Sequence, residues 1–303
     1  MITVFGSINM DLIATTAQLP RPGETVAGHG FSTAAGGKGA NQALAATRAG
    51  AAVRMAGAVG ADSFAEGALA LMAEAGTDLS LVGTVDEATG TAHILVGDDG
   101  ENMIVVVSGA NGRIGESEAR AAVASLSAGD LLMLQLEVPA AAVEAALKAA
   151  RTAGITSLIN TAPLTPEAAA LSRLADIVVA NEHEFERLAG STGLSPEERR
   201  EAMARLSGET GQTLVVTLGA DGVIAIRDGQ FYQAAGLSIT PVDTVGAGDT
   251  FCGYLAAGLD DGLSFERALR RAAIAGSLAC LAPGAQPAIP MAADVDSAEI
   301  EAA

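Results

Sequence analysis

In the second half of the chain, Gly246, Ala247 and Gly248 precede Asp249, a combination that could bind an anion and accept a proton. The first three residues carry almost no side chain, so an anion can approach their backbone N–H groups, and a helix beginning here adds the positive end of its dipole. Asp249 falls in the first turn of that helix, where a carboxylate is favoured by about 0.3–1 kcal/mol. An ionised acid beside a phosphate-binding turn is typical of a general base that deprotonates a hydroxyl. A plain capped helix N-terminus is the structural alternative, and this segment alone favours neither.

Two short polar residues follow the first apolar run of the chain. Residues 2–5 are typical of a buried strand, and Asn9 and Asp11 come soon after them. Ligands of open α/β sheets bind at the carboxyl ends of the strands, so these side chains could hold ligand hydroxyls. Asn and Asp are also ordinary turn residues, which leaves both interpretations open.

A glycine-rich segment, residues 35–50, contains Gly36, Gly37, Lys38 and Gly39. It resembles a P-loop only superficially, because the lysine is followed by glycine rather than Ser or Thr and the spacing of the leading glycine is wrong. The glycines would instead let the backbone approach a ligand. We expect Asn41 to open a helix, which the helix-forming residues 43–49 continue.

Polar residues also follow three later apolar runs. Glu137 follows LLMLQL and is either a helix-start acid or a ligand to a sugar hydroxyl. Asn181 and Glu184 follow IVVA and share one helix face, an arrangement that also fits a capping box. The local sequence TLGADG, residues 217–222, could close a hairpin.

The remaining segments alternate between strand-like and helical patterns. This alternation predicts an α/β fold with a mostly parallel central sheet and helices on both faces. The expected strands are residues 2–5, 53–59, 131–136, 157–159, 177–179, 214–217 and 223–226, and the clearest helices are residues 64–75, 116–127, 139–152 and 264–282.

A second, smaller sheet is predicted from two separate regions. Residues 12–35 break into short β-like pieces, 12–16, 24–28 and 29–35, and residues 90–97 and 102–108 flank an Asp-Asp-Gly hairpin turn. We expect this sheet to serve as a lid that excludes water. The α/β domain would comprise residues 1–11, 36–89 and 109–303, and the lid would comprise residues 12–35 and 90–108.

The overall composition excludes several classes of partner. The 303 residues carry a formal charge of −19 and a pI of about 4.4, which argues against binding a nucleic-acid backbone or an anionic membrane surface. Cys252 and Cys280 are too few for a disulfide framework, and the scattered histidines lack metal-site spacing. No stretch has the length of a membrane span and the first residues do not follow a signal-peptide pattern, so we expect a cytoplasmic protein.

Several of these motifs together resemble one family. DTVGAGD, residues 243–249, resembles the signature of the ribokinase-like carbohydrate kinases, the PfkB family, and GGKGAN, residues 36–41, resembles the sugar-binding signature of that family. GSINMD, RPGETV, GGKGANQA, GENMI, SGAN and GAQP are similar to its ribose-phosphorylating members. The resemblance extends from Gly6 to Pro290 and implies a ribokinase-like fold.

The resemblance implies transfer of a phosphoryl group from ATP to O5 of D-ribose. It implies that Asp249 is the general base and that Gly246, Ala247 and Gly248 form the anion hole. The implied sugar contacts are Asn9, Asp11, Gly37, Lys38, Gly39, Asn41, Glu137 and Asp249. The implied nucleotide contacts are Asn181, Glu184, Thr217, Gly219, Ala220, Gly222 and Gly248. Asn181 and Glu184 would also tune the binding of Mg²⁺.

The resemblance also implies a K⁺ site and a dimer. By position, the cation ligands would be Asp243, Val245, Ala279, Ala282, Gly284 and Ala288. Ala288 stands where many relatives place a serine, so one side-chain ligand is missing here. A lid sheet has a face and edges to cover, so we expect a homodimer formed through the lids.

Other functions stay open on the sequence alone. The acceptor could be fructose, deoxyribose or a nucleoside such as adenosine, although aromatic residues that could stack on a base make up only 3% of the chain. A non-catalytic sugar or nucleotide sensor could use the same fold. A dinucleotide-binding oxidoreductase is excluded because residues 6–11 do not supply its G-x-G-x-x-G motif.

Overall fold

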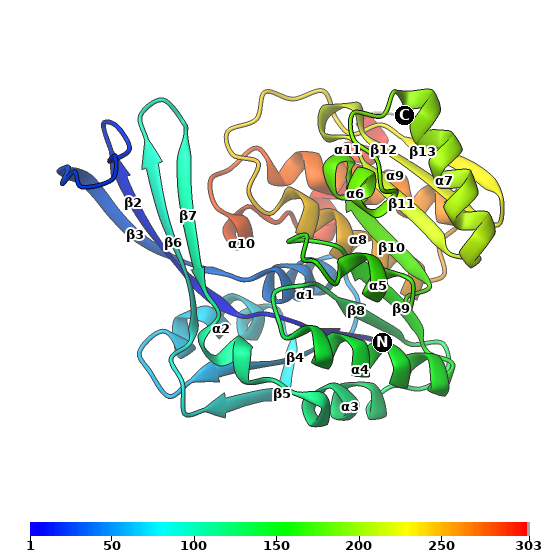
Figure 1. The fold of residues 1–303 in the computed structure, drawn as a ribbon, viewed down its shortest axis with the longest axis horizontal. Coiled ribbons are helices and arrows are strands. Elements are labelled where there is room, and N and C mark those ends of the chain that lie inside the picture. The colour runs from blue at the N-terminus through cyan, green and yellow to red at the C-terminus, as the bar shows by residue number, and fades with distance from the viewer. Residues whose placement is uncertain (302–303) are drawn as a thin grey trace.

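The main body of the protein is built on one mixed β-sheet (Figure 1). The computed structural model describes residues 1–301, in which nine strands form this sheet in the order β13-β12-β11-β10-β9-β8-β1-β4-β5. The strands from β11 to β5 are parallel, whereas β12 and β13 are antiparallel additions at one edge, so the predicted mostly parallel sheet is confirmed. The strands are β1 (Ile2–Phe5), β4 (Val53–Gly60), β5 (Asp78–Val85), β8 (Leu131–Leu134), β9 (Thr156–Asn160), β10 (Ile177–Asn181), β11 (Thr213–Thr217), β12 (Val223–Arg227) and β13 (Gln230–Ala234).

Helices cover both faces of this sheet and enclose two hydrophobic cores (Figure 1). Successive strand residues point to opposite faces, so Val4 lies in one core and Phe5 in the other. The first core lies under α1 (Lys38–Arg48), α2 (Ala65–Ala75), α8 (Ala247–Asp260), α9 (Phe265–Ala279) and α11 (Ala292–Glu301). The second lies under α3 (Glu116–Ala124), α4 (Ala140–Ala153), α5 (Ala168–Ser172), α6 (Glu182–Leu188) and α7 (Pro196–Thr210).

A separate four-stranded sheet projects from the main body (Figure 1). Its order is β3-β2-β6-β7, with β2 (Asn9–Thr16), β3 (Gly28–Gly36), β6 (Gly90–Gly97) and β7 (Asn102–Val107). The predicted smaller sheet is therefore present. The prediction of a strand at residues 24–28 is wrong, because Arg21 and Glu24 close a turn instead. Glu24 N donates to the Arg21 carbonyl, and Arg21 N donates to the Glu24 side chain.

Sequence patterns missed two edge strands of the main sheet and misplaced the start of α1. β5 and β13 are half-exposed, so they lack the continuous apolar run of a buried strand. α1 begins at Lys38 rather than Asn41, because its first N–H groups find acceptors outside the helix. Lys38 N donates to Glu137, and Gly39 N donates to Ser7 Oγ.

Helices α1 and α8 cross at very short range over the first core. A Cβ built on Gly253 of α8 would lie 2.5 Å from Ala45 Cβ and 2.7 Å from the backbone of Ala46 and Gln42 on α1. A glycine is therefore required at this crossing. None of the helices within residues 1–301 is long and apolar enough to cross a membrane.

Replacing Gly253 by alanine should destabilise the protein even though alanine favours helices. The added methyl group would overpack the α1–α8 crossing, at a cost of about 1–3 kcal/mol. The matched control is Gly208 in α7, where a Cβ meets no heavy atom within 4 Å. Gly208→Ala should instead stabilise by about 0.5–1 kcal/mol. Thermal unfolding should show opposite shifts of Tm, and equal shifts would contradict a tight crossing.

Candidate active site

Asp249 lies buried in the first turn of α8, with 6% of its surface exposed. Both of its carboxylate oxygens accept hydrogen bonds from side-chain amides of α1. Asn41 Nδ2 lies 2.9 Å from Oδ2, and Gln42 Nε2 lies 2.9 Å from Oδ1. The short α1–α8 crossing thus brings the glycine-rich segment to the acid that follows the GAG turn.

The turn before Asp249 is open for an anion to approach. Gly246 has φ 77°, a left-handed conformation, and a Cβ there would lie 2.8 Å from Ala285 Cβ. The first N–H groups of a helix have no intrahelical acceptor, so Gly248 and Asp249 present theirs at the positive end of the α8 dipole. Beside Gly248 a Cβ would meet no heavy atom within 4 Å, so this side of the turn is open.

A polar pocket of about 220 Å³ adjoins this turn. It brings together predicted site residues from four segments of the chain, namely Lys38, Asn181, Glu184, Thr217, Gly246, Gly248 and Asp249. Its remaining lining residues, none of which was a predicted site residue, are Asn160, Ala162, Val179, Thr244 and Cys252. Burial raises the pKa of the Cys252 thiol well above its ordinary value, so this pocket residue stays protonated and is a poor nucleophile.

Acidic groups concentrate around Lys38. Burial, with the charges of Glu137 and Asp249, raises the pKa of Asp11 to about 6. Within residues 1–301 the Asp11 carboxylate accepts no hydrogen bond, and it lies against Gly36. Asp249, together with Glu137 and Glu184, raises the pKa of Lys38 against the opposing effect of burial. Lys38 therefore stays positively charged among these acids.

Asn9 and Glu137 are already fixed by other side chains. Asn111 Nδ2 donates to Asn9 Oδ1 at 2.7 Å and to the Ile8 carbonyl, and Asn111 Oδ1 accepts from Ile8 N. Glu137 Oε2 accepts from Ser7 Oγ at 2.6 Å and from Lys38 N at 3.0 Å. Asn111 ends the SGAN motif, but sequence reasoning gave it no role, because it lies in a short 3₁₀ segment whose contact with Asn9 is made only in the fold. Glu137 thus caps the N-terminus of α1, whatever ligand it also contacts.

The two motifs on the other side of the pocket have clear local roles. Asn181 Oδ1 accepts from Glu184 N while Glu184 Oε2 accepts from Asn181 N, which is a capping box at the start of α6. Residues 217–222 close a hairpin between β11 and β12, in which Gly219, Ala220 and Gly222 form the turn. Both structural alternatives are therefore realised, and Glu184 and Thr217 line the pocket as well.

The segments expected to bind a monovalent cation pack together around Asp243. Its Oδ1 accepts from Val245 N at 3.0 Å, and its Oδ2 accepts from Gly284 N at 2.9 Å. Ala279 ends α9, and Ala282 lies between α9 and Gly284. Ala288 is buried in α10 (Ala285–Ala288) and offers no side-chain oxygen. Within residues 1–301, His, Cys, Asp and Glu side chains form no cluster of three or more that could hold a metal ion.

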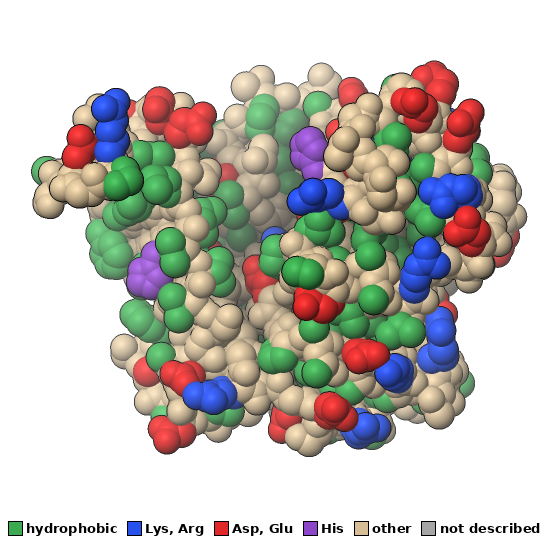
Figure 2. Space-filling view, viewed as in Figure 1, with side chains coloured by type: hydrophobic (Ala, Val, Ile, Leu, Met, Phe, Trp, Pro, Cys, Tyr) green, Lys and Arg blue, Asp and Glu red, His purple; other side chains and the backbone are tan. Residues whose placement is uncertain are grey.

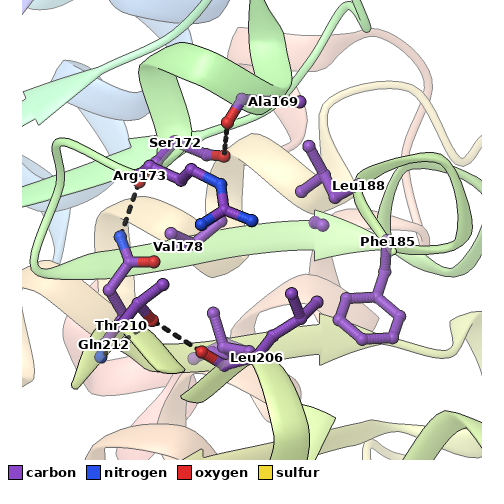
Figure 3. Close-up of a pocket in the computed structure, with 12 residues that line it drawn as sticks. Ala169, Ser172, Arg173, Val178, Phe185, Leu188, Leu206, Thr210 and Gln212 are labelled. Carbon is purple, nitrogen blue, oxygen red and sulfur yellow. Dashed lines mark hydrogen bonds between the residues drawn. The ribbon is translucent and has the colours of Figure 1, made fainter. Parts of the chain in front are cut away.

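A second cavity, of about 40 Å³, lies apart from these residues between α5, α6, α7 and the sheet (Figure 3). It is lined mainly by apolar side chains such as Val178, Phe185 and Leu206. Gln212 is anchored at its edge, donating to the Ser172 and Ala175 carbonyls. None of the predicted site residues lines this cavity, so we place the functional site at the larger pocket.

Comparison with known proteins assigns the chain to a family. The family model for pfkB family carbohydrate kinases matches residues 1–292, and the chain belongs to this family. It is 37% identical over 290 residues to a ribokinase from Haemophilus influenzae, with 95% of each chain covered. It is 32% identical over 291 residues to a deoxyribokinase from Salmonella typhi, again with 95% of each covered. The structure of Arabidopsis thaliana ribokinase complexed with ribose and ATP matches with a TM-score of 0.87 at 32% identity, covering 98% of this chain and 97% of that one. The protein is thus a carbohydrate kinase with a ribokinase fold.

The raised pKa of Asp11 predicts a pH-dependent cost to stability. The folded protein binds the proton of the Asp11 carboxyl group more tightly than the unfolded chain, in which this group has a pKa of 3.8. The contribution of Asp11 to stability therefore falls as pH rises from 4 to 6. Asp11→Asn should therefore stabilise the ligand-free protein at pH 7.5 by about 1–3 kcal/mol, a difference that largely vanishes near pH 4. Thermal unfolding of both proteins across this range measures it.

Asp78 provides a control of opposite sign. Hydrogen bonds from Ser80 and Arg54 lower the pKa of Asp78 to about 2, so Asp78→Asn should destabilise the protein at pH 7.5. A lower Tm for Asp11→Asn at pH 7.5 would contradict the assignment of Asp11 as a strained, unpaired carboxylate.

Proposed function

We propose that the protein transfers the γ-phosphoryl group of ATP to O5 of D-ribose, giving D-ribose 5-phosphate. The observation that carries this proposal is the buried Asp249 carboxylate, which two amides hold beside an open helix N-terminus. A fixed base next to an anion-binding turn is what phosphoryl transfer to a hydroxyl requires. Family membership and the similarity to a ribokinase complexed with ribose and ATP support a sugar acceptor and a nucleotide donor.

The sugar would be held by groups that lack partners in the ligand-free protein. Asn41 is 6% exposed, and within residues 1–301 its Oδ1 has no hydrogen-bond partner. The half-buried Asp11 carboxylate likewise accepts no hydrogen bond from this part of the chain. Both can accept hydrogen bonds from sugar hydroxyls, with Asn9, Glu137 and the backbone of Gly37, Lys38 and Gly39 completing the subsite. Unpaired acceptors that gain donors on binding favour a polyhydroxylated ligand over an apolar one.

The reaction would be an in-line displacement at the γ-phosphorus. The Asp249 carboxylate takes the O5 proton as O5 bonds to phosphorus, and the bond from phosphorus to the β,γ-bridging oxygen breaks with its electron pair leaving on ADP. The N–H groups of Gly246, Gly248 and Asp249 lie at the positive end of α8, where they would stabilise charge on the transferring group, whereas Ala247 N donates to the Thr244 carbonyl. Lys38 adds a fixed positive charge to the same pocket.

The nucleotide side of the pocket suits Mg²⁺ bound mainly through phosphates and water. Glu184 Oε2 is occupied by Asn181 N and Thr161 Oγ1, while Oε1 can still accept from a metal-bound water. Thr217, Gly219, Ala220 and Gly222 would contact the nucleotide from the β11–β12 hairpin. Mg²⁺, when bound, neutralises charge on the transferring phosphates.

The segments around Asp243 offer a donor set that suits K⁺. Asp243 contributes a carboxylate, and the neighbouring backbone can add carbonyl oxygens from Val245, Ala279, Ala282 and Gly284. These are the oxygen ligands that hard cations prefer. Ala288 cannot contribute a side-chain oxygen, so a site here would depend on the backbone. A cation would stabilise the anion turn, since Gly246 packs directly on Ala285.

The choice of acceptor can be tested directly by measuring ADP formation with ribose, 2-deoxyribose, fructose and adenosine, with and without K⁺. The similarity to a deoxyribokinase makes 2-deoxyribose the most informative competitor. We expect ribose to give the highest kcat/KM. A preference for another sugar would change the acceptor but retain the mechanism, whereas the absence of acceptor-dependent turnover would favour a sensor.

Replacement of Asp249 by alanine tests the proposed base. General-base removal costs about 10²–10⁴-fold in kcat, and we expect that loss with the fold intact. Circular dichroism and Tm would confirm folding. Turnover close to wild type in Asp249→Ala would remove this residue from the mechanism.

We further propose that two copies associate through the small sheet. Strand pairing places Phe31, Met103 and Val105 on one face of this sheet. Phe31 pairs with Ala14, which pairs with Leu95, and Leu95 and His93 pair with Met103 and Val105. Phe31 is 72% exposed and Val105 is 63% exposed, and Figure 2 shows hydrophobic side chains gathered on this projecting sheet. An apolar face and two unpaired sheet edges suit a second copy of the chain.

Val105→Lys should convert the dimer to a monomer, because a charge would be buried against an apolar partner face. Analytical ultracentrifugation at micromolar concentration measures the change. Ile300→Lys is the matched control, since Ile300 is 78% exposed on α11, away from the small sheet. A monomeric wild-type protein would refute this interface.

A further inference from the structure

A chain of buried side-chain amides leads to Asp249 from the centre of the main sheet. Gln135, just after β8, donates from Nε2 to Gln42 Oε1 at 2.6 Å. Gln42 in turn donates from Nε2 to Asp249 Oδ1 at 2.9 Å and to Asn160 Oδ1 at 3.2 Å. Both glutamines are fully buried, with 0% of their surface exposed. Gln42 lies in the GGKGANQA motif and Gln135 in the apolar run LLMLQL, but sequence patterns gave neither residue a role.

The direction of these hydrogen bonds is set by the charge at one end. An ionised Asp249 accepts but cannot donate, so Gln42 must present its NH₂ group to it. The Gln42 carbonyl oxygen then points to Gln135, which must donate. Hydrogen bonds aligned in this way polarise one another and strengthen the last bond, the one to the carboxylate.

Space for Gln135 exists because residue 6 is glycine. A Cβ built on Gly6 would collide with Gln135 Oε1 and would lie 2.9 Å from Gly39 Cα. Within residues 1–301, Gln135 Oε1 itself has no hydrogen-bond partner. A buried amide that leaves one atom unpaired is costly, so packing alone does not favour glutamine over an apolar residue at this position.

We propose that Gln135 and Gln42 form a positioning relay that fixes the orientation and charge of the Asp249 carboxylate. The inference rests on the proposed kinase function, in which Asp249 is the base. Gln42 and Asn41 each hold one carboxylate oxygen, so the group cannot rotate, and its remaining lone pairs stay directed to the pocket. Gln135 prevents Gln42 from turning its carbonyl oxygen toward Asp249.

Gln42→Met would remove the donor to Asp249 while retaining a side chain of similar length. A hydrogen bond to a charged group contributes enough that kcat should fall about 10- to 100-fold. The KM values for ribose and ATP should change less than about twofold, because Gln42 acts through the base. The acid limb of the kcat–pH profile should move up by about one pH unit, since the ionised form has lost a donor.

Gln135 offers a reversible test of the relay. Gln135→Met should reduce kcat at every pH. In Gln135→Glu, burial keeps the new acid neutral at low pH, where its O–H can still donate to Gln42. Its kcat should therefore approach the wild-type value near pH 6 and fall progressively below it as pH rises, because an ionised carboxylate forces Gln42 to turn.

Gln212→Met is the matched control for loss of a buried amide. Gln212 is 7% exposed and donates to two backbone carbonyls beside α5, far from the site. Gln212→Met should lower Tm without moving the kcat–pH profile. If the Gln42 and Gln135 variants also change only Tm, the relay is refuted while the kinase function stands. Absence of sugar-dependent turnover in wild-type protein would refute both.

Discussion

The functional site depends on the short crossing between α1 and α8. Gly253 removes the one side chain that would separate these helices, so Asn41 and Gln42 reach the carboxylate of Asp249. The same crossing holds the glycine cluster at the start of α1 next to the glycine-rich turn at the start of α8. A separation of even one methyl group would lengthen both amide contacts, and cores do not absorb such a change without cost. The geometry of the proposed base is therefore set by helix packing rather than by the loop that carries it.

The second constraint is the concentration of negative charge around one lysine. Asp11, Glu137, Asp249 and Glu184 all act on Lys38 or on each other, and burial, together with the charges of Glu137 and Asp249, raises the pKa of Asp11 against the opposing effect of Lys38. Unpaired acidic acceptors destabilise a ligand-free protein, yet they are the groups that a sugar hydroxyl satisfies. The pocket thus stores a cost in stability that ligand binding can relieve, a common property of binding sites.

The fold and most of the proposed site were predictable because their signals are local. Alternation of strands and helices indicated the sheet, and the motifs around Asp249 and Gly36 carried the recognisable chemistry. Gln42 and Gln135 were not predictable in the same way. Gln42 lies among strong helix formers and Gln135 directly follows the buried strand β8, so neither local pattern assigns it a role. Their contact spans 93 positions of the chain and exists only because folding brings the end of β8 to α1. The start of α1 was misplaced for the same reason, since its capping groups come from Ser7 and Glu137.

One strand of the small sheet, β2, also carries residues of the candidate site. β2 begins at Asn9, passes through Asp11 and ends at Thr16, so a single strand runs from the proposed sugar contacts into the projecting sheet. On one side it pairs with β3, which ends at Gly36 beside the glycine cluster, and on the other with β6. A hydrogen-bonded strand resists local bending, so a shift of Asp11 toward a ligand would displace the sheet as a unit. The proposed sugar contacts and the exposed apolar face would in this way be coupled through one strand, and a partner subunit on that face would act on the same strand.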